Sequence, residues 1–163
     1  MHLSPDERIL KVYHHHYFPY AILLAKTIGA SIPFYFVLFL FADAIDGNAL
    51  LLLNAAIVLL FLLVVAYITF VYWMDRLIIT NKRVVYIDWK FITIRTESEA
   101  KLNDIQDVRT VERGVLSSIP FLDYGIVTIR TASDKTLIEF PEAPNPEAIR
   151  HVIYQIQKQF HIH

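Results

Sequence analysis

Residues 49–74 read ALLLLNAAIVLLFLLVVAYITFVYWM, and this stretch decides the fold. It contains no charged residue, and only Asn54 and Thr69 clearly interrupt its apolar character. A helix needs about 20 predominantly apolar residues to cross the roughly 30 Å hydrocarbon core of a bilayer. The stretch therefore predicts a membrane-spanning helix over about residues 49–73, with the rings of Tyr72 and Trp73 at headgroup level.

A second apolar segment, Tyr17–Ala42, precedes this run and predicts another span over about residues 20–42. Lys26 interrupts it, but the long lysine side chain can carry its ammonium group to the nearer interface. Pro33 falls in mid-span and predicts a kink. The alternative is a cleaved signal peptide ending near residues 42–44. It is disfavoured because the leader would be unusually long and a second apolar run follows at once.

The connection between the two spans, Asp43–Asn48, is short enough to force an antiparallel hairpin. It holds two aspartates and no basic residue, whereas basic residues flank the hairpin on both sides. We therefore expect a multi-pass protein of the cell membrane with both termini in the cytoplasm and the aspartate turn outside. The chain then divides into a cytoplasmic N-terminal segment (residues 1–16), the transmembrane hairpin (17–74) and a soluble domain (75–163).

After Trp73 the sequence changes to short β-branched runs separated by turn residues, which is typical of a small β sandwich or barrel. The dipeptide Asn81-Lys82 predicts a hairpin between the first two strands. Asn145 as N-cap and Pro146 at the first helical position predict a C-terminal helix. We interpret its apolar stripe as a lid on the β core; a membrane-surface or partner-binding helix is the alternative. The predicted strands are Arg76–Thr80, Arg83–Asp88, Phe91–Thr96, Val108–Arg113, Gly125–Thr131 and Thr136–Phe140.

Three stretches of this region carry a family resemblance: Leu77–Tyr86 (LIITNKRVVY), Leu102–Val108 (LNDIQDV) and Tyr124–Ala132 (YGIVTIRTA). With a hydrophobic hairpin directly before them, they resemble the bacterial pleckstrin-homology (PH) domain family of membrane proteins. The resemblance implies a membrane α-helical hairpin followed by a mostly β domain. That domain would be a PH-like bent β barrel or sandwich, capped by a C-terminal amphipathic helix. The resemblance implies no settled biochemical activity.

Motifs and composition favour a protein without catalytic activity. The chain has no cysteine, and it contains no glycine-rich phosphate loop, nucleophile elbow or zinc-protease motif. The runs His14–His16 and His161–His163 lie at flexible or interfacial ends without an acidic ligand motif, so we expect solvated histidines and no metal site. We expect no enzyme activity and no cofactor. The net charge of −1 gives nucleic-acid binding no global electrostatic support.

A basic strip over residues 76–95 follows the second span directly, and Asp88 is its only acid. Tethering would hold this strip near anionic lipid, where each lysine or arginine contributes about 1 kcal/mol of attraction. The alternative is that these residues only set the topology and the hairpin turn. The candidate headgroup contacts are Arg76, Lys82, Arg83 and Lys90.

Residues 114–122 form an apolar segment between two predicted strands. We interpret it either as a loop folded into the core or as an exposed patch that contacts the bilayer or a protein partner. The candidate patch residues are Val115, Leu116, Ile119 and Phe121.

The predicted function is that of a non-enzymatic, membrane-anchored PH-like domain that contacts membrane lipids of the inner leaflet, a protein partner, or both. The alternative is a structural or accessory subunit of a membrane protein assembly, including a self-associated one. Asn54, the Ala55-Ala56 pair and the apolar patch would then be contacts, since small and polar residues mediate helix association in lipid. An ion pathway ranks last, because Lys26 is the only ionisable residue in the spans.

Overall fold

The computed structural model describes residues 3–91, 93–112, 122–132 and 137–160. They form two compact units, which we describe separately. One unit is the helical segment Tyr17–Phe70. The other joins Met1–His16 to Val71–His163 and contains the β strands.

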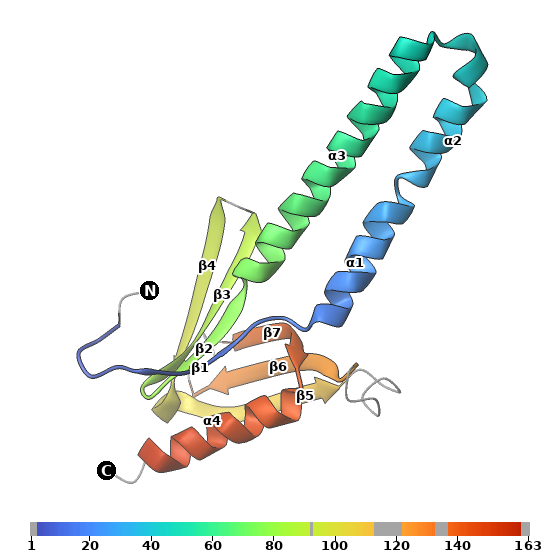
Figure 1. Cartoon of the computed structure of the whole chain (residues 1–163). Coiled ribbons are helices and arrows are strands. Elements are labelled where there is room, and N and C mark those ends of the chain that lie inside the picture. The colour runs from blue at the N-terminus through green and yellow to red at the C-terminus, as the bar shows by residue number, and fades with distance from the viewer. Residues whose placement is uncertain (1–2, 92, 113–121, 133–136, 161–163) are drawn as a thin grey trace. The chain divides into compact units, whose positions relative to one another are not determined.

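The helical unit contains α1 (Tyr17–Gly29), α2 (Ile32–Leu40), the short 3-10 helix η1 (Ala42–Ala44) and α3 (Gly47–Met74), which continues into the second unit (Figure 1). The predicted kink is confirmed as a break between α1 and α2. It falls just before Pro33 because proline lacks an N–H and its ring clashes with the carbonyl four residues earlier.

Two contacts join α3 to the helices before it. The hydroxyl groups of Tyr20 and Thr69 lie 2.7 Å apart, and Phe34 packs edge-on against Phe61 with ring centroids 5.5 Å apart. Tyr17–Leu40 and Gly47–Met74, of 24 and 28 residues, are long and apolar enough to cross a membrane.

The β unit contains two antiparallel sheets. The first has the order β1-β2-β3-β4 and the second the order β5-β6-β7. Among the described residues these sheets do not close into a barrel, so the two-sheet form of the expected fold applies. The strands are β1 (Ile9–Tyr13), β2 (Arg76–Thr80), β3 (Arg83–Phe91), β4 (Ile94–Lys101), β5 (Ile105–Glu112), β6 (Tyr124–Thr131) and β7 (Leu137–Pro144), with the 3-10 turn η2 (Leu102–Asp104) between the sheets.

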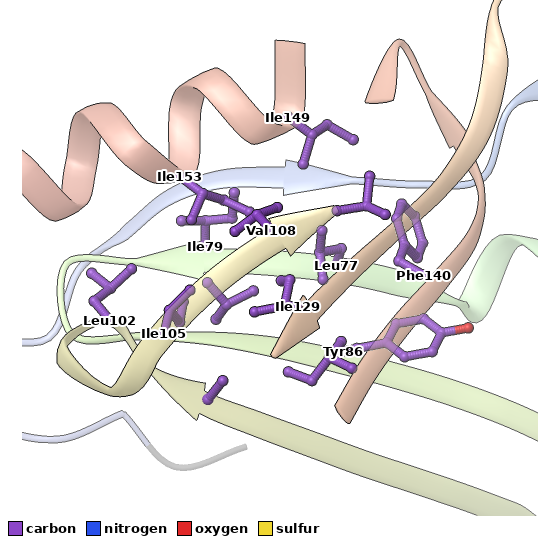
Figure 2. Packing of buried hydrophobic residues seen from close by; sticks show 14 of the residues in the cluster. Leu77, Ile79, Tyr86, Leu102, Ile105, Val108, Ile129, Phe140, Ile149 and Ile153 are labelled. Atoms are coloured by element: carbon purple, nitrogen blue, oxygen red, sulfur yellow. The ribbon is translucent and has the colours of Figure 1, made fainter. Parts of the chain in front are cut away.

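The core lies between the two sheets and α4 (Pro146–Phe160), as Figure 2 shows. Leu77 and Phe140 come from different sheets, and Ile149 and Ile153 reach the same cluster from α4; all four are fully buried. The side-chain oxygen of Asn145 accepts a hydrogen bond from the N–H of Ala148 at 2.9 Å, which confirms the predicted N-cap. The burial of Ile149 and Ile153 in the core confirms the interpretation of the C-terminal helix as a lid on the β core.

Strand β1 was not predicted. It pairs with β2, with Tyr13 opposite Leu77 and Val12 opposite Ile78. Because these neighbouring strands precede and follow the helical segment in the sequence, that segment is an insertion in the β1–β2 connection (Figure 1). The N-terminal residues Met1–His16 therefore belong to the same compact unit as Val71–His163.

The predicted strand Phe91–Thr96 is wrong. Phe91 ends β3 and pairs with Ile94, which begins β4, so the chain reverses direction inside that run. Alternation of side chains did not reveal this reversal, because the turn residue Thr93 is β-branched like the residues of a strand.

Candidate functional site

A buried ion pair lies beside the β2–β3 turn. The Glu7 side chain is fully buried, and its carboxylate accepts hydrogen bonds from Arg83 Nε at 2.9 Å, Arg83 Nη2 at 3.1 Å, the Thr80 hydroxyl at 2.9 Å and the Ser4 N–H at 2.9 Å. Burial raises the pKa of Glu7, but the bonds from Arg83, Ser4 and Thr80 outweigh it and lower the pKa to about 2. Arg83 also pairs with Glu99.

A pocket of about 450 Å³ opens over this ion pair, between the N-terminal segment, the β2–β3 turn, the end of β4 and Phe160. Several of its polar groups form hydrogen bonds within the protein. Lys82 Nζ donates to the Pro5 carbonyl at 2.8 Å, and the side-chain amide of Asn81 donates to the Asp6 carbonyl at 3.0 Å and accepts from the Arg8 N–H at 2.8 Å. We therefore interpret the pocket as part of the contact that holds the N-terminal segment against the β2–β3 turn.

The four candidate headgroup contacts do not form one cluster. Arg76 begins β2 and lies opposite Ile87, and Lys90, three residues further along β3, lies toward the same end of the sheet. Lys82 and Arg83 lie at the β2–β3 turn, roughly 15 Å away along the strands. The structure therefore places Arg76 and Lys90 toward one end of the sheet and Lys82 and Arg83 at the other.

The end of the sheet that carries Arg76 and Lys90 is also where α3 ends. The N–H of Trp89 donates to Asp75 Oδ1 at 2.7 Å, which holds the end of β3 against the first residue after α3. Trp73 is 66% exposed and Ile94 is 50% exposed, and Arg76 and Lys90 are exposed as well. This proximal edge, defined as Trp73, Arg76, Lys90 and Ile94, combines basic and apolar side chains.

A second polar cluster surrounds His15 and His16, where the chain leaves β1 and where it returns from α3. His15 Nδ1 lies 2.7 Å from the Pro141 carbonyl and Nε2 lies 3.4 Å from Asp75 Oδ2. The His15 ring stacks on Phe140 at 4.9 Å, and only 4% of its side chain is exposed. His16 is also buried, and burial lowers its pKa despite the nearby Asp123. The expectation of solvated histidines is thus wrong for these two, although His14 is exposed.

Neither cluster had a local signal in the sequence. Glu7 and Arg83 are 76 residues apart, and His15 and Pro141 are 126 residues apart. The apolar patch (Val115, Leu116, Ile119, Phe121) and His161–His163 lie outside the described residues. Within the part of the chain that the structure describes, no group of three or more histidine or acidic side chains could hold a metal ion.

Two sheets of four and three antiparallel strands, closed by a C-terminal helix, define a PH-like domain. The profile described as the bacterial PH domain matches residues 55–140, which is more than half of the chain. The chain therefore belongs to the bacterial PH domain family, as its sequence motifs had indicated. PH domains are generally binding modules for lipids or proteins rather than catalysts. No curated protein and no solved structure matches the chain significantly.

Proposed function

We propose that this protein is a non-enzymatic PH-like binding domain, anchored in the cell membrane by its helical hairpin, whose proximal edge contacts lipid headgroups of the inner leaflet. Two observations support the anchor. The candidate spans have mean hydropathies of 1.8 and 3.0, and no part of either apolar window is buried inside the protein. Such exposed apolar surface needs a lipid environment.

One observation carries the lipid contact: the exposed Arg76 and Lys90 lie at the end of the sheet that is bonded to the residue directly after α3. If α3 spans the bilayer, its C-terminal end lies at the interface, where tryptophan and basic residues are favoured. Two cations there contribute roughly 2 kcal/mol of attraction to anionic lipid. We leave Arg83 out of the proposed contacts, because its guanidinium is already paired with Glu7 and Glu99.

The experiment uses single-cysteine variants of the full chain, which has no cysteine of its own. An environment-sensitive fluorophore is attached at Ile94 or, as a matched control, at Lys101, the other end of β4 and roughly 24 Å away. In vesicles containing anionic lipid we expect blue-shifted, lipid-quenched emission at Ile94 and aqueous emission at Lys101.

The double substitution Arg76→Glu with Lys90→Glu should abolish the difference in emission between the Ile94 and Lys101 positions. Lys82→Glu, at the far turn, should leave that difference unchanged. In the same vesicles, lipid quenching of Trp73 in a Trp89→Phe background reports the anchor separately. Equal aqueous emission at Ile94 and Lys101, with Trp73 quenched, would show that the domain is anchored but does not contact lipid through this edge.

A homo-oligomeric accessory subunit is the second candidate. One observation favours it: Asn54 lies in α3 beside a groove of about 260 Å³ that is lined by Leu50 and by residues of α2. A defined stoichiometry in a native-mass measurement of the detergent-extracted protein would support this candidate.

A further inference from the structure

The pocket beside the β2–β3 turn contains basic groups that its internal contacts leave available. Among the described residues, three basic and two acidic side chains line it. Arg83 is the partner of both acids, Glu7 and Glu99. The other two cations, Lys82 and Lys101, form no ion pair with a described residue. Because the basic side chains outnumber the acidic ones, the pocket carries a net positive charge.

Backbone pairing holds the two lysines near each other. Arg83, the residue after Lys82, lies directly opposite Lys101 in the β3–β4 register, so the side chains of Arg83 and Lys101 share a face of the sheet. The N–H of Leu102 donates to the Lys82 carbonyl at 3.0 Å and ties the β2–β3 turn to the end of β4. Like charges directly opposite each other destabilise a sheet. An anion bound at this place would relieve the repulsion.

Both lysine side chains have hydrogen-bond donors to spare. An ammonium group has three N–H donors. Lys82 uses one of them on the Pro5 carbonyl at 2.8 Å, and the Lys101 side chain has no hydrogen-bond partner among the described residues. A phosphate monoester carries about −1.5 to −2 charge at pH 7 and three acceptor oxygens. Two cations with spare donors therefore match a phosphate monoester better than a carboxylate, which has a single charge and two oxygens.

We propose that this pocket binds the phosphate group of a small phosphate monoester, with Lys82 and Lys101 as its charged contacts. The volume of about 450 Å³ falls within the roughly 300–1,000 Å³ of small-molecule sites. Asn103, which also lines the pocket, offers an amide donor, and the ring of Phe160, 40% exposed, offers an apolar wall to the rest of the ligand.

A phosphate monoester is present both in soluble molecules and in the headgroup of phosphatidic acid. The pocket lies at the β2–β3 turn, whereas the proximal edge lies toward the other end of the sheet. If the proximal edge contacts lipid, as proposed above, the pocket is directed to the soluble source. The binding of phosphate does not depend on the lipid contact; only the choice of source does.

The test is an NMR titration of the full chain in micelles of a non-ionic detergent at constant ionic strength. The probes are glycerol 3-phosphate and, in a separate arm, phosphatidic acid added to the micelles. We expect glycerol 3-phosphate to cause saturable shifts in the backbone amide signals of Lys82, Leu102 and Asn103, and phosphatidic acid to cause none. Saturable shifts with phosphatidic acid alone would support the phosphate site and assign its ligand to a lipid headgroup.

Substitutions of single lysines test whether the two ammonium groups are the contacts. Losing a charge-assisted hydrogen bond to phosphate should weaken binding roughly tenfold. We therefore expect Lys82→Gln and Lys101→Gln each to raise the dissociation constant for glycerol 3-phosphate by about that factor. Lys11→Gln is the matched control, because it removes the same charge at an exposed residue outside the pocket and should keep the parent's dissociation constant.

Lys101→Gln keeps the test decisive if losing the Pro5 contact unfolds Lys82→Gln, since the Lys101 side chain holds no described residue in place. The proposal would be overturned if neither probe shifted these amide signals saturably. It would also be overturned if Lys101→Gln bound glycerol 3-phosphate as the parent does, or if Lys11→Gln weakened binding as much as Lys101→Gln.

Discussion

At the scale of single residues, Glu7 is the most demanding position in the β unit. Its carboxylate is buried, and an isolated charge there would be strongly disfavoured. Arg83, Thr80 and the Ser4 N–H supply the compensating hydrogen bonds, so the charged form is retained. Removing Arg83 would leave Glu7 as an uncompensated buried charge, whereas Arg83 without Glu7 would keep its pair with Glu99.

We expect Glu7→Gln to lower the free energy of unfolding by about 2 kcal/mol near neutral pH, because the charge-assisted hydrogen bonds from Arg83 are weakened. The pH dependence of the free energy of unfolding should change too. The pKa of Glu7 is about 2 in the folded chain against an ordinary value of 4.5, so the unfolded chain takes up the proton first. The stabilisation that ionised Glu7 gives the folded chain is complete above about pH 4.5 and is lost as the pH falls toward 2. Glu7→Gln should therefore lose less stability than the parent over that interval.

Thermal unfolding of the detergent-solubilised chain at several pH values measures both effects. Glu99→Gln is the matched control, because Glu99 also pairs with Arg83 but is 59% exposed. An exposed pair contributes at most about 1 kcal/mol. Equal losses in the two variants would contradict the importance of burial at Glu7.

At the scale of elements, β5, β6 and α4 approach one another closely at Gly125. A Cβ atom built on Gly125 would lie 2.1 Å from the Val111 carbonyl oxygen and 2.9 Å from Pro146 Cγ. The first is a backbone atom in the strand that pairs with β6, so it cannot move aside without breaking the ladder.

We expect Gly125→Ala to destabilise the β unit by about 2–3 kcal/mol, because overpacking forces backbone shifts. The lost protection in hydrogen exchange should be concentrated at the β5–β6 pairing and the first turn of α4. Gly47→Ala is the control, since a Cβ there would meet no atom within 4 Å. Parent-like stability of Gly125→Ala would show that the strands can separate more easily than their register suggests.

Elements with a local signature could be predicted from the sequence, and elements without one could not. Strand β2 was predicted with its observed bounds, and the Asn145 cap and the apolar stripe of α4 were visible in adjacent residues. Strand β1 has only five residues, and four of them are exposed. It becomes a strand because β2 offers it hydrogen bonds across a long insertion, and no local pattern records that.

The candidate site, too, could be predicted from the sequence only in part. The basic strip is visible in the sequence, but grouping its members requires the register that separates Arg76 and Lys90 from the turn. Arg83 resembled its neighbours in the sequence, and only Glu7, distant in the chain, shows that its charge is already neutralised. His15 likewise belonged to a run of three identical residues that the fold treats differently.

At the scale of the whole molecule, strand pairing bears on the membrane topology independently of charge. Because β1 and β2 are hydrogen-bonded neighbours, residues 9–13 and 76–80 must lie on the same side of any membrane that the intervening helices cross. An odd number of crossings between them is incompatible with this sheet. A two-span hairpin satisfies the requirement, and for such a hairpin the positive-inside rule predicts a cytoplasmic β unit.

We therefore expect cysteines at Ser4 and Lys101 to be inaccessible to an impermeant thiol reagent in intact cells, and a cysteine at Asn48 to be labelled. All three positions are exposed, and the chain has no other cysteine to react. After permeabilisation all three should label equally, which controls for local reactivity. Labelling of Ser4 and Lys101, but not Asn48, from outside would reverse the orientation and leave the hairpin intact. Labelling of only one of Ser4 and Lys101 would contradict the fold itself, because β1 and β2 would then lie on opposite sides of the membrane and could not pair. The hairpin would no longer be an insertion within a single β domain.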